Sequence, residues 1–114
     1  MGRRRLTVWA FAAAVAIGCN SPTLPLPPPA LPSVTAASEP GKVHLKSTRG
    51  VEANAIVILY NRNPAVTRDL RVTGVQADGD GSWEQTITAQ RGDIVELTEE
   101  FGSLHSPSTT FQIP

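Results

Sequence analysis

Side chains that could carry chemistry are few in this chain, and they are far apart. It contains one cysteine and two histidines, Cys19, His44 and His105. Neither histidine has a second one at metal-ligand spacing, and the chain has no Gly-x-Ser-x-Gly elbow and no glycine-rich phosphate loop. A nucleophile at Ser103 or Ser106 beside His105 is geometrically open, but nothing in the sequence orients the histidine as a base. The sequence therefore predicts a protein that is not an enzyme, and a hydrolase is the weaker alternative.

Asp78 and Asp80 are the candidate metal ligands, and they stand in the stretch "ADGDGSW". Calcium prefers carboxylate oxygens, but a helix–loop–helix calcium site also needs oxygens, a glycine and a distal acid at fixed positions, and only these two aspartates fit. A tight turn explains the same residues, because Gly79 and Gly81 supply positive φ and aspartates hydrogen-bond their own backbone. We expect a turn without a metal or cofactor, with a weak cation site as the alternative.

Two other acidic motifs have structural explanations. Glu99 and Glu100 are adjacent, and neighbours on a strand point to opposite faces. They cannot flank one substrate bond as a glycosidase pair would, so the sequence predicts a solvated strand end. Arg91-Gly92-Asp93 spells an integrin-recognition tripeptide, but a Gly-Asp turn before a strand accounts for two of its three residues.

The N-terminus has the layout of a secretory signal peptide. Arg3–Arg5 precede the apolar run Leu6–Ile17, and the small residue Gly18 follows. Spanning a bilayer takes roughly 20 apolar residues, so the run is too short for a permanent transmembrane helix. We expect residues 1–18 to be removed. Three of the ten basic residues leave with them, so seven remain against ten acidic ones, a net charge of −3. Without clustered Lys and Arg, nucleic-acid binding is not expected.

Cys19 follows this leader directly, and a lone cysteine in an exported chain cannot form an internal disulfide. The stretch Ala16–Cys19 resembles the lipobox of bacterial lipoproteins, although Ala16 stands where that family more often has Leu. The resemblance implies that Cys19 becomes the new N-terminus and carries thioether-linked diacylglycerol, often with an amide-linked acyl chain such as palmitate. Two or more acyl chains hold a protein stably in a membrane. An ordinary signal peptide and an uncleaved anchor are the alternatives.

The residue after Cys19 bears on location. In the enteric sorting rule, Asp at this position retains a lipoprotein at the inner membrane, and here Asn20 stands there. The resemblance therefore implies a lipid anchor in the outer membrane of a bacterial cell envelope.

Residues 19–34 form the predicted tether. Asn20–Pro32 contains six prolines in 13 residues, and proline fixes φ and supplies no N–H. The segment is expected to be disordered or to adopt polyproline II, extending about 3.1 Å per residue, or roughly 40 Å in all. A docking ligand for a proline-recognition groove is the alternative.

Residues 35–114 are expected to form one all-β domain. Runs rich in Val, Ile, Thr and aromatic residues are broken by Gly, Pro, Asn or Asp about every 8 to 12 residues, as in sandwiches of short strands. The spacing predicts a sandwich or barrel, with strands expected at 42–47, 55–61, 70–77, 82–88, 93–97 and 109–114. The family resemblance described below implies a small immunoglobulin-like β-sandwich of about six to seven strands.

Individual strands can be described further. Alternation along 42–47 places His44 on the outer face. The segment 55–61 is apolar on both faces and is expected to be central and fully covered. A bulge at Gly74 would accommodate a shift of frame within 70–77, and Trp83 is the expected anchor of the core.

Three stretches of the domain carry a family resemblance. They are "SEPGKVHL", "QADGDGSWEQTITA" and "RGDIVEL", and they resemble the bacterial immunoglobulin-like repeat domains of surface lipoproteins and adhesins, and the related carboxypeptidase-regulatory-like sandwiches. The resemblance covers roughly residues 38–114, and its motifs are turns, so it implies a fold more than a function. Such modules usually occur in tandem or beside a larger domain, whereas this chain has one copy.

These features together predict a membrane-anchored, non-catalytic structural or protein-interaction module with a possible envelope protein as partner. The alternative is an adhesin-like module that binds a ligand or glycan. Exposed Tyr60 and Phe101 sharing a face beside a cleft would favour that alternative. A bare sheet edge would favour strand addition by a protein partner.

Overall fold

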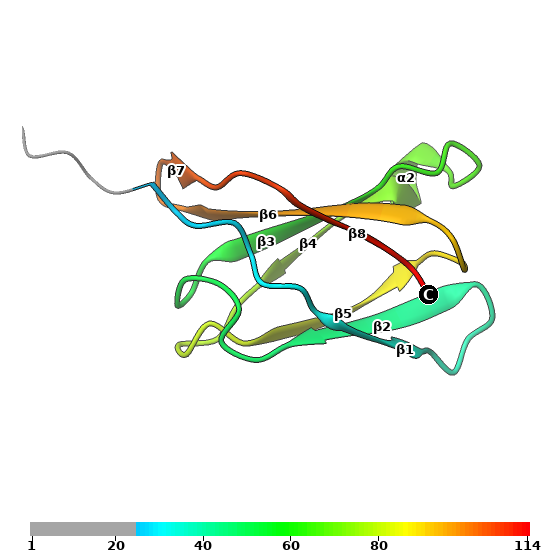
Figure 1. The fold of residues 1–114 in the computed structure, drawn as a ribbon, viewed down its shortest axis with the longest axis horizontal. Coiled ribbons are helices and arrows are strands. Elements are labelled where there is room, and N and C mark those ends of the chain that lie inside the picture. The colour runs from blue at the N-terminus through cyan, green and yellow to red at the C-terminus, as the bar shows by residue number, and fades with distance from the viewer. Residues whose placement is uncertain (1–24) are drawn as a thin grey trace, which may run out of the picture.

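Two antiparallel sheets packed face to face make up the fold of residues 25–114, which are the residues described by the computed structural model (Figure 1). The first sheet has the order β1-β2-β5, with β1 at Ser33–Ala36, β2 at Lys42–Ser47 and β5 at Trp83–Thr88. The second has the order β4-β3-β6-β7, and β8 also pairs with β6. Its strands are β3 (Ile56–Asn61), β4 (Val72–Gln76), β6 (Ile94–Phe101), β7 (Leu104–His105) and β8 (Thr109–Gln112). The predicted all-β sandwich is confirmed.

The core lies between the sheets and is built from alternate residues of the strands. Successive side chains on a strand point to opposite faces, and in β2 this buries Val43 and Leu45 while His44 stays on the outer face. Trp83 is 4% exposed, so its predicted place in the core is confirmed. The buried cluster consists of Val43, Leu45, Val57, Leu59, Ala77, Trp83, Ile87, Ala89, Val95, Leu97 and Ile113.

The segment 55–61 differs in part from expectation. Its strand, β3, is central, because it pairs with β4 on one side and with β6 on the other. It is covered on one face only: Val57 and Leu59 are buried, whereas Ile56 is exposed on the outer face. Antiparallel sheets commonly pack one face and leave the other to solvent.

The predicted bulge at Gly74 is also absent from the structure. Strand β4 begins at Val72 and keeps regular register with β3 through Gly74. No change of frame occurs, because Val72 is exposed on the outer face while Val75 and Ala77 face the core, and Leu70 lies in the short helix α2 (Arg68–Arg71). No helix within residues 25–114 is long and apolar enough to cross a membrane.

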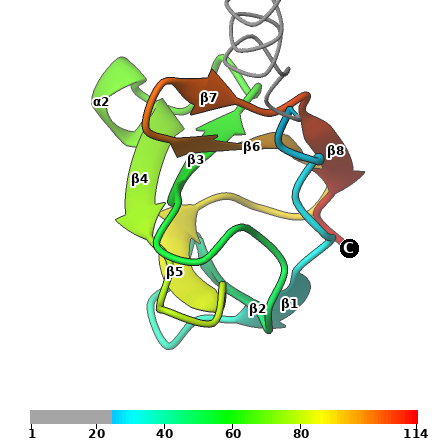
Figure 2. The same cartoon turned by 90° about the vertical axis from the view of Figure 1, so that its left-hand side faces the viewer.

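Part of the proline-rich segment belongs to the folded domain. Figure 2 shows residues 25–32 running from β8 to β1 across one open side of the sandwich. Leu26 and Pro29 are buried there, and the Thr109 hydroxyl donates to the carbonyl oxygen of Pro29. Β1 begins at Ser33, so the predicted domain boundary at residue 35 falls inside a strand. Prolines suit this position because they bury apolar carbon without an N–H that needs a partner.

Two leucines of this segment provide a direct test. Leu26 is 6% exposed and Leu31 is 65% exposed. Leu26→Ala is expected to lower the free energy of unfolding by about 2 kcal/mol or more, because it removes buried methyl groups and leaves a cavity. Leu31→Ala is expected to change it by less than about 0.5 kcal/mol. Urea unfolding of both variants makes the measurement, and equal effects would show that residues 25–32 do not pack on the sandwich.

Candidate functional site

The residues singled out for lipidation and metal binding lie in different parts of the chain. Cys19 is outside the described residues. Asp78 and Asp80 lie in the turn between β4 and β5, where the Asp78 N–H donates to the Ser82 carbonyl at 2.8 Å. The Ser82 N–H donates to Asp80 Oδ1 at 3.1 Å, and hydrogen bonding from Ser82 holds the pKa of Asp80 below its usual value. Among residues 25–114, no three His, Cys, Asp or Glu side chains gather closely enough to hold a metal.

One of the two glycines in this turn has the expected conformation. Gly81 has a φ of 82° and is buried. A Cβ at this position would collide with the carbonyl oxygen of Val51, so a larger residue would push the neighbouring loop away. Gly79 has no positive φ, so the expectation for that residue was wrong.

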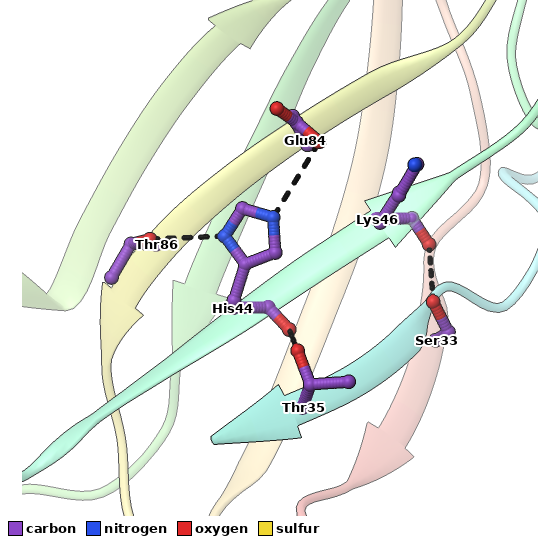
Figure 3. A network of polar contacts seen from close by, with 6 residues as sticks. All are labelled: Ser33, Thr35, His44, Lys46, Glu84 and Thr86. Atoms are coloured by element: carbon purple, nitrogen blue, oxygen red, sulfur yellow. Dashed lines mark hydrogen bonds and ion pairs between the residues drawn. The ribbon is translucent and has the colours of Figure 1, made fainter. Parts of the chain in front are cut away.

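His44 lies at the centre of a polar cluster on the outer face of the three-stranded sheet (Figure 3). Its Nδ1 is 3.1 Å from Thr86 Oγ1 and its Nε2 is 3.5 Å from Glu84 Oε2. A hydroxyl, an imidazole and a carboxylate in this order resemble the groups of a catalytic triad. Here His44 and Thr86 are directly opposite each other on β2 and β5, and Glu84 is about 61% exposed. Such cross-strand contacts stabilise a sheet, and they account for this cluster without a catalytic role.

The second histidine has a similar surface position. His105 lies in β7 rather than in a loop, and its Nδ1 is 3.6 Å from Glu100 Oε2. The Ser106 hydroxyl accepts from the Glu99 N–H at 2.8 Å and donates to the Pro107 carbonyl at 2.8 Å. This hydroxyl therefore holds the chain that leaves β7, and it is not hydrogen-bonded to His105.

Glu99 overturns the predicted solvated strand end. Strand β6 continues past residue 97 to Phe101, and Glu99 is fully buried on its inner face. Glu99 Oε1 accepts the Glu52 N–H at 2.8 Å, whereas Oε2 has no partner. Burial raises the pKa of Glu99 above its usual value. Trp83 Nε1 is the other buried side-chain atom that lacks a partner in the described part of the chain.

Asp93 is the second buried carboxylate, and in contrast to Glu99 both of its oxygens accept hydrogen bonds. Its Oδ2 accepts from Asn61 Nδ2 and from the Gln90 N–H, both at 3.0 Å, and its Oδ1 accepts from Asn63 Nδ2 at 2.9 Å. Burial opposes ionisation, but these three donors outweigh it and hold the pKa of Asp93 below its usual value. Gly92 has a φ of 91°, which confirms the predicted turn. Asp93 is turned inward, so its carboxylate is not displayed as part of an Arg-Gly-Asp surface motif.

The strand pattern contains a signal for both carboxylates. Asp93, Val95, Leu97 and Glu99 stand two residues apart, so they share one face if the strand runs through all four. Because the strand was expected to end at residue 97, Glu99 was not recognised as a member of this inward row. Asn61 and Asn63 were not singled out at all, because their role depends on contact with a turn about 30 residues away.

The two aromatic residues considered for a glycan platform do not share a face. Tyr60 is opposite Glu96 on the outer face of the second sheet. Phe101 lies five residues further along β6, at a position of the opposite parity, so it points to the other side. The arrangement that would have favoured a glycan platform is therefore not observed.

Strand β4 has a free edge, which is the arrangement expected to favour strand addition by a protein partner. The Ala77 N–H donates to the Ala55 carbonyl at 2.8 Å, and hydrogen-bonded pairs alternate along an antiparallel ladder. The outward-directed N–H and C=O groups of β4 therefore belong to Val72, Gly74 and Gln76. No other strand within residues 25–114 pairs with this edge.

Side chains beside this edge form an exposed apolar strip, which we call the β4 surface. It consists of Val72, Gly74, Ile56, Ile58 and Tyr60 on the outer face of β4 and β3, and the polar Gln76 lies opposite Ile56 at the end of the same face. Val72 is 54% exposed and Ile56 is 41% exposed. The neighbouring outer row of β6 begins with Ile94 and continues with the polar residues Glu96, Thr98 and Glu100. Glu96 forms an ion pair with Arg62 at 2.8 Å. The outer face of this sheet is thus apolar toward β4 and charged toward β6.

Comparison with known proteins finds no matching family model, curated protein or solved structure. The functional argument therefore depends on the residues and their geometry.

Stability is expected to depend on pH in opposite ways through the two buried carboxylates. The raised pKa of Glu99 means that the native state binds its proton more tightly than the unfolded chain does. Its contribution to stability is present below the unfolded pKa and is lost as pH rises through the native pKa. Glu99→Gln keeps an oxygen for the Glu52 N–H but removes the buried charge, so it is expected to raise the free energy of unfolding at neutral pH.

Asp93→Asn is the matched change at the other end of the strand. The lowered pKa of Asp93 contributes stability that is present above the unfolded pKa and is lost as pH falls through the native pKa. An amide would place a donor against existing donors, so the variant is expected to lose about 1 to 3 kcal/mol at neutral pH. Urea unfolding at neutral and acidic pH measures both variants, and effects of the same sign would contradict this assignment.

Proposed function

We propose that this protein is a lipid-anchored, non-catalytic interaction module of the bacterial cell envelope that binds an extended segment of a partner protein at the β4 edge. The observation that carries this proposal is the bare β4 edge with apolar side chains beside it. An added strand would pair with the outward groups of Val72, Gly74 and Gln76, and its apolar side chains would continue the β4 surface.

The edge strands of the two sheets differ in how readily another strand could pair with them. On the side of β8 and β1, residues 25–32 close the opening (Figure 2). On the opposite side, β5 presents polar outer side chains, and its outward carbonyl at Thr88 accepts from Asn61 Nδ2 at 3.0 Å. Natural sheets protect edges with charged residues, proline, bulges or covering segments. Within residues 25–114, strand β4 has none of these along its five residues, which is expected of an edge that is meant to be paired.

A lipid anchor on Cys19 would hold this surface close to a membrane. Leu26 is the first buried residue of the domain, and seven residue steps separate it from Cys19. A fully extended chain spans at most about 3.6 Å per residue, so the domain would lie within about 25 Å of the acylated residue. The packing of residues 25–32 thus shortens the spacer that the sequence suggests, and it favours a partner that is itself near the membrane. Asn20 supports the outer membrane as the site.

Anchoring predicts a change in partitioning when Cys19 is replaced. Cys19→Ala is expected to move the protein from the detergent phase to the aqueous phase and to abolish incorporation of labelled palmitate, because no thiol remains to be acylated. Asn20→Ala, which leaves the thiol in place, is the control and should stay in the detergent phase. Detergent partitioning of Cys19→Ala like that of the unchanged chain would contradict acylation.

Strand addition predicts crosslinks from one edge of the second sheet. The full chain would carry the photoreactive residue p-benzoylphenylalanine at Val72, or at the exposed Thr110 on β8 as control, and would be irradiated in the bacterial envelope. A discrete adduct is expected from position 72 and not from position 110. Gly74→Lys should abolish it, because a charged side chain at an edge obstructs an incoming strand.

Gly74 can accept this substitution without disturbing the fold. The nearest atom to a Cβ placed there is the Val57 carbonyl oxygen at 3.9 Å, an ordinary contact distance. Equal adducts from both photoreactive positions, or an adduct that persists in the Gly74→Lys variant, would refute the β4 edge as the binding site.

A further inference from the structure

A cavity of about 300 Å³ lies at the end of the sandwich where α2 faces the turn before β6. Its apolar wall contains Val66 and Ala89, which are buried, and Leu70, which is 50% exposed at the surface. Asn63, Gln90 and Asp93 supply polar groups to the same cavity. Ligand sites typically combine an apolar lining with a few polar groups and begin at about this volume, so the cavity suits a small molecule.

Hydrogen bonds hold the walls in place before any ligand arrives. Arg71 donates through Nε and Nη2 to the Val66 carbonyl at 3.2 and 2.9 Å, and through Nη2 to the Pro64 carbonyl at 3.2 Å. The Ala65 N–H donates to Asn63 Oδ1 at 2.9 Å, and Asn63 in turn donates to Asp93. The loop from 62 to 71 is thereby tied to the turn at 90–93. Preorganised walls reduce the entropy lost on binding.

Asp93 is the one charged side chain among the residues that line this cavity. A carboxylate offers about four acceptor positions, and three donors reach Asp93: two at Oδ2 and one at Oδ1. Oδ1 therefore retains capacity for one more donor. The residue as a whole is only 7% exposed, so a donor placed there would be largely shielded from competing water.

We propose that this cavity binds a short alkylammonium group, with the ammonium donating to Asp93 Oδ1 and the aliphatic chain packing against Val66, Leu70 and Ala89. The negative charge of Asp93 selects a cation over an anion of the same length. The apolar wall selects an alkyl chain over a bare inorganic cation. A free alkylamine and a lysine side chain share this chemistry. The site is separate from the β4 edge and does not depend on the function proposed for that edge.

Three probes of similar size separate charge from hydrophobic packing. The isotope-labelled protein would be titrated with n-butylammonium, 1-butanol and butyrate, with amide chemical shifts as the readout. Saturable shifts confined to residues around the cavity are expected for n-butylammonium, weaker shifts for 1-butanol and none for butyrate. Nα-acetyl-lysine methylamide would then show whether a lysine side chain binds as well as the free amine, or whether only the free amine fits.

A pair of leucine variants provides the structural control. Leu70→Lys places a positive charge at the mouth of the cavity and is expected to weaken n-butylammonium binding at least tenfold. Leu31→Lys makes the same change at a distant exposed site and should leave binding unchanged. Butyrate or 1-butanol binding as tightly as n-butylammonium, no saturable shift with the amine, or equal loss in both variants would overturn the proposal. If Leu70→Lys does not fold, the three probes on the unchanged chain still decide.

Discussion

The inner face of β6 is the constraint on which this structure depends. Three of its inward positions carry two aliphatic side chains, Val95 and Leu97, and the carboxylate of Glu99, and Asp93 continues the same row directly before the strand. The aliphatic pair, Val95 and Leu97, is fully buried against the opposite sheet, which fixes the register of the strand, because a slip of one residue would turn the whole row outward. Once that register is fixed, both carboxylates must enter the interior, one at each end of the core.

The two carboxylates at the ends of the core differ in the hydrogen-bond donors that surround them. At Asp93 the interior supplies three donors, and the same hydrogen bonds fasten two loops together and form the polar side of a cavity. At Glu99 the interior supplies one backbone N–H and leaves an oxygen without a partner. A buried polar group is costly when it is not hydrogen-bonded, so one end of the sandwich is held by its carboxylate and the other is strained by it. The cavity that Asp93 lines is at the end of the sandwich that this carboxylate holds.

The edges of the sheets show a corresponding asymmetry. The proline-rich segment closes the side between β8 and β1, where the buried Leu26 and Pro29 replace the protection that another strand would give. Β4 on the other side keeps its outward backbone groups and apolar neighbours exposed. Such an edge invites aggregation unless a partner occupies it, and confinement near a membrane would limit the partners that reach it. The proposed anchor, the spacer and the open edge are therefore consistent with the proposed mode of action, contact with a component of the cell envelope.

The sequence by itself determined the all-β class, the inward face of β2, the burial of Trp83 and the turns at Gly81 and Gly92, because these follow from the two-residue period of strands and from backbone sterics at glycine. The predicted leader and the predicted acylation of Cys19 also come from the local sequence, and they stay predictions. The same two-residue period also carries a signal for the burial of Glu99, whereas tertiary structure alone decided that Asn61 and Asn63 serve Asp93, that residues 25–32 pack on the domain, and that β4 is the open edge. Each of these depends on which segment lies opposite another, and contacts across tens of residues arise from packing that no local pattern encodes.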